Sequence, residues 1–507
     1  MVAVLICLRV SGQENTDKSK MDLGSEKLAR PSALLHGEWE QSHPRSLSKV
    51  TGQNLDSMIT AVIQANHFPG LAACIVKGEK IAWEGYYGLA NISTDHPVDA
   101  NTVFTLASVS KTVTASALMQ LWERGRFQLD DSINAYLPFP IRNPHFPAAA
   151  ITFRNLLTHS SSIRDNFNYY PYYWGSDPPI ALGRYLREYL TPGEPYYSSA
   201  NYSSTSAPGA SVSYCNIGVS LGGYLVEVIS GVPFDQYCRD SIFVPLGMTN
   251  TAWFLRDLDT SLIAHPYAWS GSFYSDYGLY SAASYPAGQL HTTTRSLARW
   301  LIANINFGRL GVVRVLDSAT VRLMRTVEYW PQDWGGAGVG LVWMTGALSD
   351  GRWVWFHDGR TLGVLTTINL DEVQKTGVII LTNANPVNVD AIVSIQNTLF
   401  TIGDTLAVSV PPTQDGPGLP THYALSQNYP NPFNPSTTIR YELPKASQVN
   451  LSVYDMLGRE VSVLVNERRE AGVHKVKFDG SYLSSGVYFY RLQAGDFVQT
   501  KKFVLSK

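Results

Sequence analysis

Hydrophobic and polar residues follow two different patterns along this chain of 507 residues. Up to about residue 400, apolar residues recur at helical spacing in some segments and form short continuous runs in others. Helices are predicted to begin near residues 55, 105, 153, 216, 294 and 389, and strands are predicted at 71–76, 80–86, 339–344, 353–356, 364–370 and 377–381. This mixture predicts a globular domain that contains both helices and strands.

The pattern changes after a Pro/Gly-rich stretch at 406–419. Short alternating runs then follow at intervals of about ten residues, with glycine-containing turns between them. Strands are predicted at 437–441, 449–454, 473–478, 487–492 and 497–505. This spacing predicts a small all-β, immunoglobulin-like sandwich. The predicted domains are a leader (1–50), an α+β domain (51–403), a linker (404–422) and the sandwich (423–507).

Three segments lack a clear periodicity. Residues 13–48 are polar and of mixed charge, which is typical of a disordered leader. Residues 166–213 and 265–285 contain many tyrosines among serine, proline and glycine. Long loops inside a compact domain are often functional, so these segments are candidates for substrate contact, although surface loops anchored by tyrosine are an equal alternative.

Composition excludes some functions and leaves others open. A formal net charge of −2 gives no reason to expect nucleic acid as a partner. The four cysteines lack metal-ligand spacing, and buried free thiols are favoured over a Cys215–Cys238 bridge. The apolar start at 2–8 is either part of a signal peptide or a chance run, and no other stretch predicts a membrane span.

Ser108 and Lys111 carry the first chemical signal. They are three residues apart at the start of a predicted buried helix, so both side chains lie on one face, one turn apart. A serine hydroxyl becomes a nucleophile when a neighbouring base accepts its proton, and a buried lysine can be that base. Ser-x-x-Lys alone is a weak motif, so the remaining chain must support it.

Two further motifs follow in order: Tyr214-Cys215-Asn216 before a helix, and His357-Asp358-Gly359 after an apolar run. With the supporting stretches 68–70, 156–159, 245–248 and 286–290, residues 55–399 resemble the serine β-lactamase and penicillin-binding superfamily. The resemblance is to the branch of class C β-lactamases, D,D-peptidases, D-aminopeptidases and esterases. It implies an α+β, β-lactamase-like fold, in which an antiparallel sheet is flanked by helices and an all-helical region is added. It implies no metal or organic cofactor.

The resemblance also implies roles for the motif residues. Ser108 would attack a carbonyl carbon, and Lys111 with Tyr214 would move the proton. Asn216 would bind Lys111 or the substrate amide, while His357 and Gly359 would complete the third motif. The oxyanion hole would consist of the backbone N–H groups of Ser108 and Arg360.

The sequence contains two competing motifs, and it differs from the family pattern at two positions. Ser220 lies in a Gly-x-Ser-x-Gly pattern, but no strand precedes it, as that nucleophile requires. Lys375 opens a Lys-Thr-Gly pattern, but its position between two apolar runs predicts a hairpin turn. In the family, lysine usually occupies the position of His357, and glycine that of Ser162. The family position of His159 is structural, so His159 is not included in the predicted site.

The C-terminal module resembles the type IX secretion sorting domain. The resemblance rests on residues 425–435, on Ser485-Gly486-Val487-Tyr488 and on residues 501–505. It implies that the secretion machinery is a partner and that the protein is secreted or displayed on the cell surface. A carbohydrate-binding sandwich is the less favoured alternative.

The sequence therefore predicts a secreted serine hydrolase that cleaves an ester or amide in a small molecule or short peptide through an acyl-enzyme. Within enzymes, the alternatives are a D-stereospecific peptidase (a D,D-carboxypeptidase or D-aminopeptidase) and a weak β-lactamase. Outside enzymes, the alternative is a catalytically silent binding protein on the same fold. An intact set of Ser108, Lys111, Tyr214 and Asn216 argues against that alternative.

Overall fold

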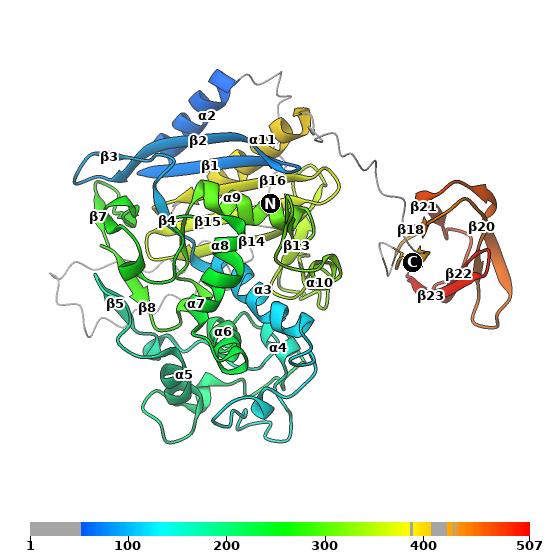
Figure 1. The fold of residues 1–507 in the computed structure, drawn as a ribbon, viewed down its shortest axis with the longest axis horizontal. Coiled ribbons are helices and arrows are strands. Elements are labelled where there is room, and N and C mark those ends of the chain that lie inside the picture. The colour runs from blue at the N-terminus through cyan, green and yellow to red at the C-terminus, as the bar shows by residue number, and fades with distance from the viewer. Residues whose placement is uncertain (1–51, 386–388, 407–422, 429–430, 432, 507) are drawn as a thin grey trace. The chain divides into compact units, whose positions relative to one another are not determined.

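The computed structural model describes residues 52–385, 389–406, 423–428, 431 and 433–506. The chain forms two compact units that divide between residues 409 and 410 (Figure 1). The predicted leader, most of the predicted linker and Cys7 lie outside the described residues. The three described cysteines, Cys74, Cys215 and Cys238, are buried and free, so Cys215 and Cys238 are not paired.

An eight-stranded antiparallel sheet forms the centre of the first unit, in the order β12-β13-β14-β15-β16-β1-β2-β3. The strands are β1 (Gly70–Lys77), β2 (Lys80–Asn91), β3 (His96–Pro97), β12 (Gly338–Val339), β13 (Met344–Ala347), β14 (Trp353–Thr361), β15 (Val364–Asp371) and β16 (Thr376–Thr382). Segments from both ends of the unit are therefore neighbours, because β1 pairs with β16.

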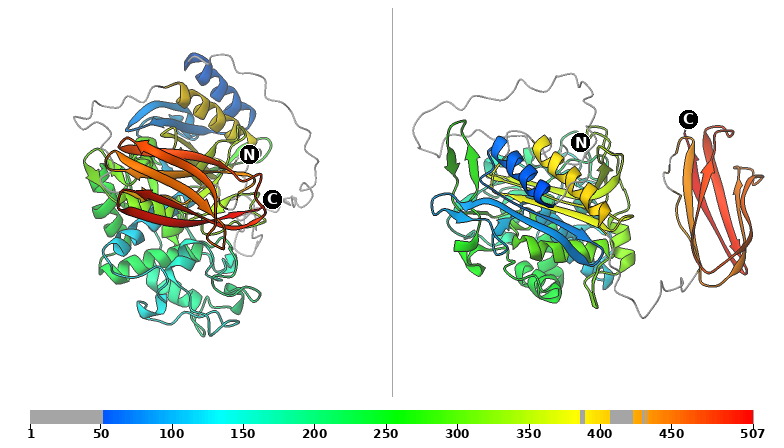
Figure 2. Two further views of the ribbon diagram at one scale, coloured as in Figure 1. Left: turned by 90° about the vertical axis from the view of Figure 1, so that its right-hand side faces the viewer. Right: turned by 90° about the horizontal axis from the view of Figure 1, so that it is seen from above.

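Both faces of this sheet are covered, which explains why every residue of β1 is buried. Leu71, Ala73 and Ile75 belong to one hydrophobic cluster, whereas the alternate residues belong to the other. Helices α2 (Gly52–Ala65) and α11 (Asp390–Thr405) pack on the first face, as the right-hand view in Figure 2 shows. Helix α9 (Thr294–Ile305) and the helical region cover the second face.

The helical region contains α3 (Ser110–Glu123), α4 (Phe153–Leu157), α5 (Leu182–Leu190), α6 (Asn216–Ser230), α7 (Phe234–Cys238) and α8 (Val244–Leu246) (Figure 1). In α3, every residue from Ser110 to Leu121 is buried. A helix that is buried on all sides must hydrogen-bond its polar side chains, and Thr114 accordingly donates to the carbonyl oxygen of Pro286 at 2.6 Å. Helix α3 is therefore the central helix of the unit.

Several sequence predictions of local structure were wrong. The strand predicted at 339–344 is two strands, β12 and β13, because Val342 has a φ of 69° and forms part of a turn. The segment predicted as a loop at 166–213 contains β5 (Tyr172–Trp174) and α5, and the second, at 265–285, contains β6 (Tyr267–Trp269), β7 (Tyr274–Asp276) and β8 (Tyr280–Ala282). The last helix continues to Thr405, past the predicted domain limit at 403.

Shorter elements connect these parts of the first unit. They are β4 (Val103–Thr105), β9 (His291–Thr293), β10 (Arg309–Leu310), β11 (Val313–Arg314) and α10 (Ser318–Met324). Among the described residues, no single helix is long and apolar enough to cross a membrane. Within these residues, one pair of helices passes the same test of length and composition when the two are taken together. The pair is Asn216–Ser230 and Phe234–Leu246, and it is bent by 83°.

The second unit has two antiparallel sheets, as the sequence predicted. One consists of β17 (Ala424–Leu425), β18 (Ser436–Leu443) and β21 (Gly472–Asp479), and the other of β20 (Glu460–Arg469), β19 (Ser447–Tyr454), β22 (Gly486–Ala494) and β23 (Phe497–Leu505). Residues from both sheets share one hydrophobic core. Strand β20 was not predicted, because it is largely exposed and ends in the charged run Glu467–Glu470.

Candidate active site

Ser108 lies in a short 3-10 turn (Ala107–Val109) that leads directly into α3. The preceding residue, Ala107, has a φ of 47°, a conformation that costs a non-glycine residue about 1–3 kcal/mol. Hydrogen bonds hold Leu106 on both sides: its N–H donates to the Leu290 carbonyl oxygen at 2.8 Å, and its carbonyl oxygen accepts from Thr366 Oγ1 at 2.6 Å. The surrounding chain therefore fixes the strained turn that presents Ser108.

Lys111 lies one turn further along, and its side chain has no exposed surface. Its Nζ donates to Ser108 Oγ at 2.8 Å, to Asn216 Oδ1 at 2.6 Å and to the carbonyl oxygen of Ala287 at 2.6 Å. These acceptors compensate for the burial of the amine. The spacing inferred from the sequence thus places a buried amine within hydrogen-bonding distance of the predicted nucleophile.

Tyr214 and Asn216 reach the same point from the start of α6, which packs against α3. Lys111 Nζ lies 4.9 Å from the centre of the Tyr214 ring. Cys215 occupies the N-cap position of α6, and its Sγ accepts a hydrogen bond from the N–H of Gly218 at 3.2 Å. The cap turns the chain so that Tyr214 and Asn216, on either side of it, both approach Lys111.

Asp165 is part of this site, although the sequence analysis missed it. Its carboxylate accepts hydrogen bonds from the backbone N–H groups of Asn216 (2.9 Å) and Ile217 (3.0 Å) and from Asn216 Nδ2 (2.7 Å). Burial raises the pKa of this carboxyl group, while the hydrogen bonds and the charge of Lys111 oppose the rise. No local pattern marks Asp165, because its partners lie about fifty residues later in the chain.

Two buried histidines border Tyr214 and Lys111. The ring of His159 stacks on Tyr214 with centroids 4.4 Å apart, and its Nδ1 accepts from the N–H of Cys215 at 3.2 Å. His357 lies on β14, and the centre of its ring is 6.4 Å from that of Tyr214. Burial, and then the charge of Lys111, lower the pKa of His159 well below 6.5 and that of His357 to about 3. Both imidazoles are therefore neutral near pH 7.

The third motif lies within β14 rather than after a strand. Strand β13 pairs with only the first part of β14, Trp353–Phe356, so the second part, His357–Thr361, borders the turn at Ser108 instead of another strand on that side. A Cβ atom on Gly359 would lie 2.3 Å from the carbonyl oxygen of Leu106. Only glycine permits this close approach of β14 to the segment that presents Ser108.

Ser220 and Lys375, the residues of the two competing motifs, form their hydrogen bonds with other parts of the fold. Ser220 is buried within α6 and donates to the carbonyl oxygen of Ser284 at 3.0 Å. Lys375 lies in the turn between β15 and β16, with a φ of 52°, and donates to the carbonyl oxygen of Ile305 at 2.8 Å. Among the described residues, no hydrogen bond joins Ser220 or Lys375 to Ser108.

Tyrosines from both aromatic segments meet beside the end of β14. Tyr172 packs edge-to-face on Tyr280, with centroids 5.5 Å apart, and Tyr170 lies next to Tyr172. The Tyr280 hydroxyl donates to the carbonyl oxygen of Leu362 at 2.7 Å. Burial raises the pKa of all three phenols, so their side chains are uncharged. The aromatic segments therefore contribute a neutral surface near the third motif.

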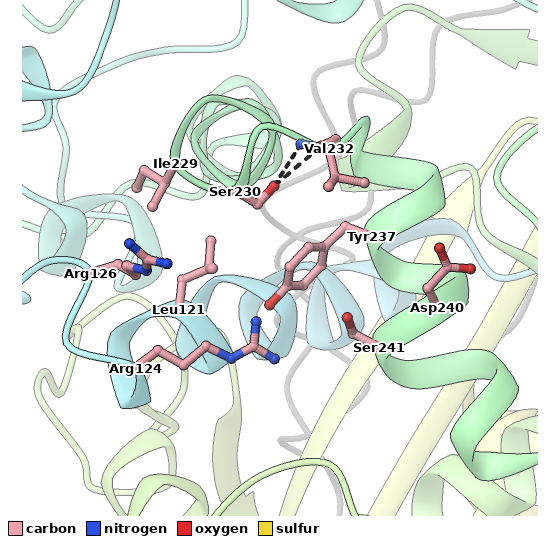
Figure 3. A pocket seen from close by; sticks show the side chains of 9 residues that line it. All are labelled: Leu121, Arg124, Arg126, Ile229, Ser230, Val232, Tyr237, Asp240 and Ser241. Atoms are coloured by element: carbon pink, nitrogen blue, oxygen red, sulfur yellow. Dashed lines mark hydrogen bonds between the residues drawn. The ribbon is translucent and has the colours of Figure 1, made fainter.

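A separate pocket of about 270 Å³ lies at the other end of α3 (Figure 3). Its lining comes from the end of α3 with the turn after it, from the end of α6 with the residues that follow it, and from the segment around α7. The lining residues are Leu121, Arg124, Arg126, Ile229, Ser230, Val232, Tyr237, Asp240 and Ser241. None of the motif residues lines this pocket, so it is distinct from the candidate active site.

A sheet covered on both faces and a central helix that begins with Ser-x-x-Lys are features of the serine β-lactamase and penicillin-binding superfamily. The family model "Beta-lactamase" matches residues 55–401, so the chain belongs to the beta-lactamase family. The model "Secretion system C-terminal sorting domain" matches residues 427–506. This domain indicates export by type IX secretion to the cell surface or the extracellular space.

The chain is also similar to individual penicillin-binding proteins. "Penicillin-binding protein 4*" of Bacillus subtilis is 27% identical over 213 residues, which cover 42% of this chain and 44% of that protein. The chain thus spans less than half the length of this relative. The octameric penicillin-binding protein homologue from Pyrococcus abyssi has a TM-score of 0.56 at 18% identity, with 90% of this chain and 96% of that chain covered.

A further structure of similar fold is the "Beta-Lactamase/D-Alanine Carboxypeptidase" from Pseudomonas syringae. Its TM-score is 0.53 at 22% identity, and the match covers 68% of this chain and 98% of that chain. These structural similarities show the β-lactamase-like fold that the sequence predicted.

Proposed function

We propose that this protein is a secreted serine hydrolase that cleaves an ester or amide through an acyl-enzyme on Ser108. The observation that carries the proposal is the 2.8 Å hydrogen bond between Ser108 Oγ and the buried Nζ of Lys111. A serine is activated when a base lies within hydrogen-bonding distance and a third group orients that base. Asn216 and the carbonyl oxygen of Ala287 orient Lys111 in this way.

The proposed acylation step requires Lys111 to have lost one proton. Ser108 Oγ then forms a bond to the substrate carbonyl carbon, and its proton moves to the amine of Lys111, assisted by Tyr214. The negative charge on the carbonyl oxygen is stabilised by the backbone N–H groups of Ser108 and Arg360. When the tetrahedral intermediate collapses, the bond to the alcohol or amine breaks and the leaving group receives the proton. Water then attacks the acyl-enzyme, and Ser108 regains its proton.

The surroundings of the site support a neutral ester as the preferred substrate. The imidazole of His357 is uncharged near pH 7, so it attracts a substrate carboxylate less than a lysine at this position would. The neutral phenols of Tyr170 and Tyr172, which packs on the buried Tyr280, offer an apolar surface for an acyl or aryl group. Short-chain or aryl esters fit these features.

A D-stereospecific peptidase is the second candidate. The stretch His357–Thr361 lacks a strand partner on the side of Ser108, so an extended peptide could lie along it. The name of the structure from Pseudomonas syringae, a D-alanine carboxypeptidase, is consistent with this candidate. A silent binding protein is less favoured, because binding alone does not require the buried lysine beside Ser108.

The experiment is a comparison of purified protein on chromogenic esters, a chromogenic cephalosporin and D-amino-acid anilides, with Ser108→Ala as the control. We expect ester hydrolysis to be the fastest activity and to disappear in the variant. Hydrolysis of D-amino-acid anilides alone would support the peptidase instead. Wild-type activity that the Ser108→Ala variant retains in full would contradict the proposal.

A further inference from the structure

Asp165 organises the first turn of α6 through one carboxylate. Its Oδ2 accepts from the N–H and the Nδ2 of Asn216, and its Oδ1 accepts from the N–H of Ile217. Cys215 Sγ lies 3.5 Å from Oδ1 as a weaker donor. A helix start needs acceptors for its free N–H groups, and Asp165 supplies them from a distant part of the chain.

The same carboxylate determines which way the Asn216 amide points. Because Asn216 Nδ2 donates to Asp165 at 2.7 Å, its Oδ1 faces Lys111 Nζ at 2.6 Å. In the opposite orientation, an NH₂ group would face the donors of Lys111, and an oxygen would face the carboxylate. Asp165 therefore makes one amide orientation much more favourable than the other.

The charge of Asp165 also acts on Lys111. The attraction is mutual, because the charge of Lys111 lowers the pKa of Asp165 against the effect of burial. The other titratable groups that face Lys111 are the neutral His159 and His357 and the phenol of Tyr214. Around Asp165 itself lie Cys215 and four tyrosines whose pKa values are raised, Tyr170, Tyr172, Tyr185 and Tyr189.

We propose that Asp165 is a positioning residue that holds the oxygen of Asn216 on Lys111 and supplies the negative charge that balances the Lys111 ammonium. Its catalytic consequence rests on the proposed function: Asp165 sets the pH range in which Lys111 can accept the proton of Ser108. The contact itself, through Asn216, does not depend on which substrate the protein cleaves.

The first test measures the protonation of Lys111 directly, without a substrate. The side-chain nitrogens of isotope-labelled lysine are titrated by NMR, and the Lys111 signal is assigned by its loss in Lys111→Ala. In Asp165→Asn, Lys111 should lose its proton at a pH lower by about one unit, because an opposite charge has been removed. An unchanged titration midpoint in a folded Asp165→Asn protein would overturn the proposal, whether or not the protein is a hydrolase.

The second test is the pH profile of ester hydrolysis. Asp165→Asn should lower kcat about 10-fold and move the acid limb of kcat/KM to lower pH, and Asp165→Ala should lower kcat about 100-fold. The control is Asp177→Asn, because Asp177 also caps a helical turn, accepting from the N–H groups of Leu255 (2.7 Å) and Arg256 (3.1 Å). If Asp177→Asn shifted the acid limb of kcat/KM by the same amount, capping alone would explain the shift, and the proposal would be overturned.

Discussion

Two stretches of the central sheet combine a basic residue with a glycine two positions later: His357-Asp358-Gly359 in β14 and Lys375-Thr376-Gly377 at the start of β16. The second matches the lysine that is usual in the family, yet only the first lies beside Ser108. Lys375 donates to Ile305 in a turn, whereas His357 lies next to Tyr214. A motif therefore indicates a candidate site only when the fold places it against the predicted nucleophile.

The two glycines show the same difference in packing. A Cβ on Gly359 would lie 2.3 Å from a backbone carbonyl oxygen, that of Leu106, in the segment that presents Ser108. A Cβ on Gly377 would lie 2.7 Å from the tip of the Leu301 side chain and 2.8 Å from that of Ile305. Side-chain tips can rotate away and a held backbone cannot, so the two positions should respond differently to substitution.

The largest expected difference is between the two lysines. Lys111→Ala should lower kcat by roughly 10²- to 10⁴-fold, because the proton of Ser108 loses its acceptor. Lys375→Ala should leave kcat within about 2-fold, because Lys375 stabilises a turn away from the site. The kcat of each folded variant is measured by steady-state ester hydrolysis. Comparable losses in the two variants would contradict the distinction between the two stretches.

Gly359→Ala should have the next largest effect on activity. The added methyl group must displace the Leu106–Ala107 backbone, and a small misplacement of a nucleophile can cost about 100-fold in kcat. Gly377→Ala should instead lower the free energy of unfolding by about 1–3 kcal/mol through overpacking and retain its kcat. Thermal unfolding and kinetics on the same samples separate these results. Retained kcat in Gly359→Ala would show that the close approach is not required.

The sequence was sufficient for features that depend on local spacing. Ser108 and Lys111 are one helical turn apart, and this spacing predicted their contact. The approach of Tyr214 and Asn216 to Lys111 was predicted only from the resemblance to the family. Their catalytic roles remain predictions. The fold class was also predicted, because the three motifs and the supporting stretches resemble the β-lactamase and penicillin-binding superfamily, and the matching family model confirms it.

Features that depend on distant contacts were missed. Asp165 lies in a tyrosine-rich segment without periodicity, and its importance comes from Asn216 and Ile217, which only folding brings close. Helix α5 was missed because the surrounding loop residues obscured its pattern. The turn at Val342 was missed because a β-branched residue with a φ of 69° contradicts its usual preference, and its N–H is held by the Leu157 carbonyl oxygen at 2.6 Å.

The opposite face of β14 gives a pH-dependent prediction. Asp358 is buried and accepts from Thr367 Oγ1 at 2.6 Å, and burial raises its pKa from 3.8 to about 7. Since this pKa is higher in the folded state, Asp358 contributes stability at low pH that is lost as the pH rises through about 7.

Asp358→Asn removes that dependence. Relative to the wild type, its free energy of unfolding should increase on the order of 2 kcal/mol from about pH 5 to about pH 8. Denaturant unfolding of both proteins at the two pH values measures the change, and Asp350→Asn, on an exposed surface, is the control. A difference between variant and wild type that stays constant with pH would show that Asp358 is ionised in the folded protein throughout.

The smallest expected effect concerns the choice of substrate. His357→Lys should shift the ratio of cephalosporin to ester hydrolysis about tenfold toward the cephalosporin, because a charge-assisted hydrogen bond to its carboxylate is gained. His357→Gln, which adds no charge, should leave the ratio unchanged. Efficient cephalosporin hydrolysis by the wild type without ester hydrolysis would refute this expectation.

The central claim is that Ser108 is the nucleophile, and covalent labelling tests it most directly. The full chain is incubated with a fluorophosphonate or a penicillin-type probe, and the modified peptide is identified by mass spectrometry. We predict one label on Ser108, lost in Ser108→Ala and slowed in Lys111→Ala. A label on Ser220, together with full hydrolytic activity of Ser108→Ala, would contradict the account.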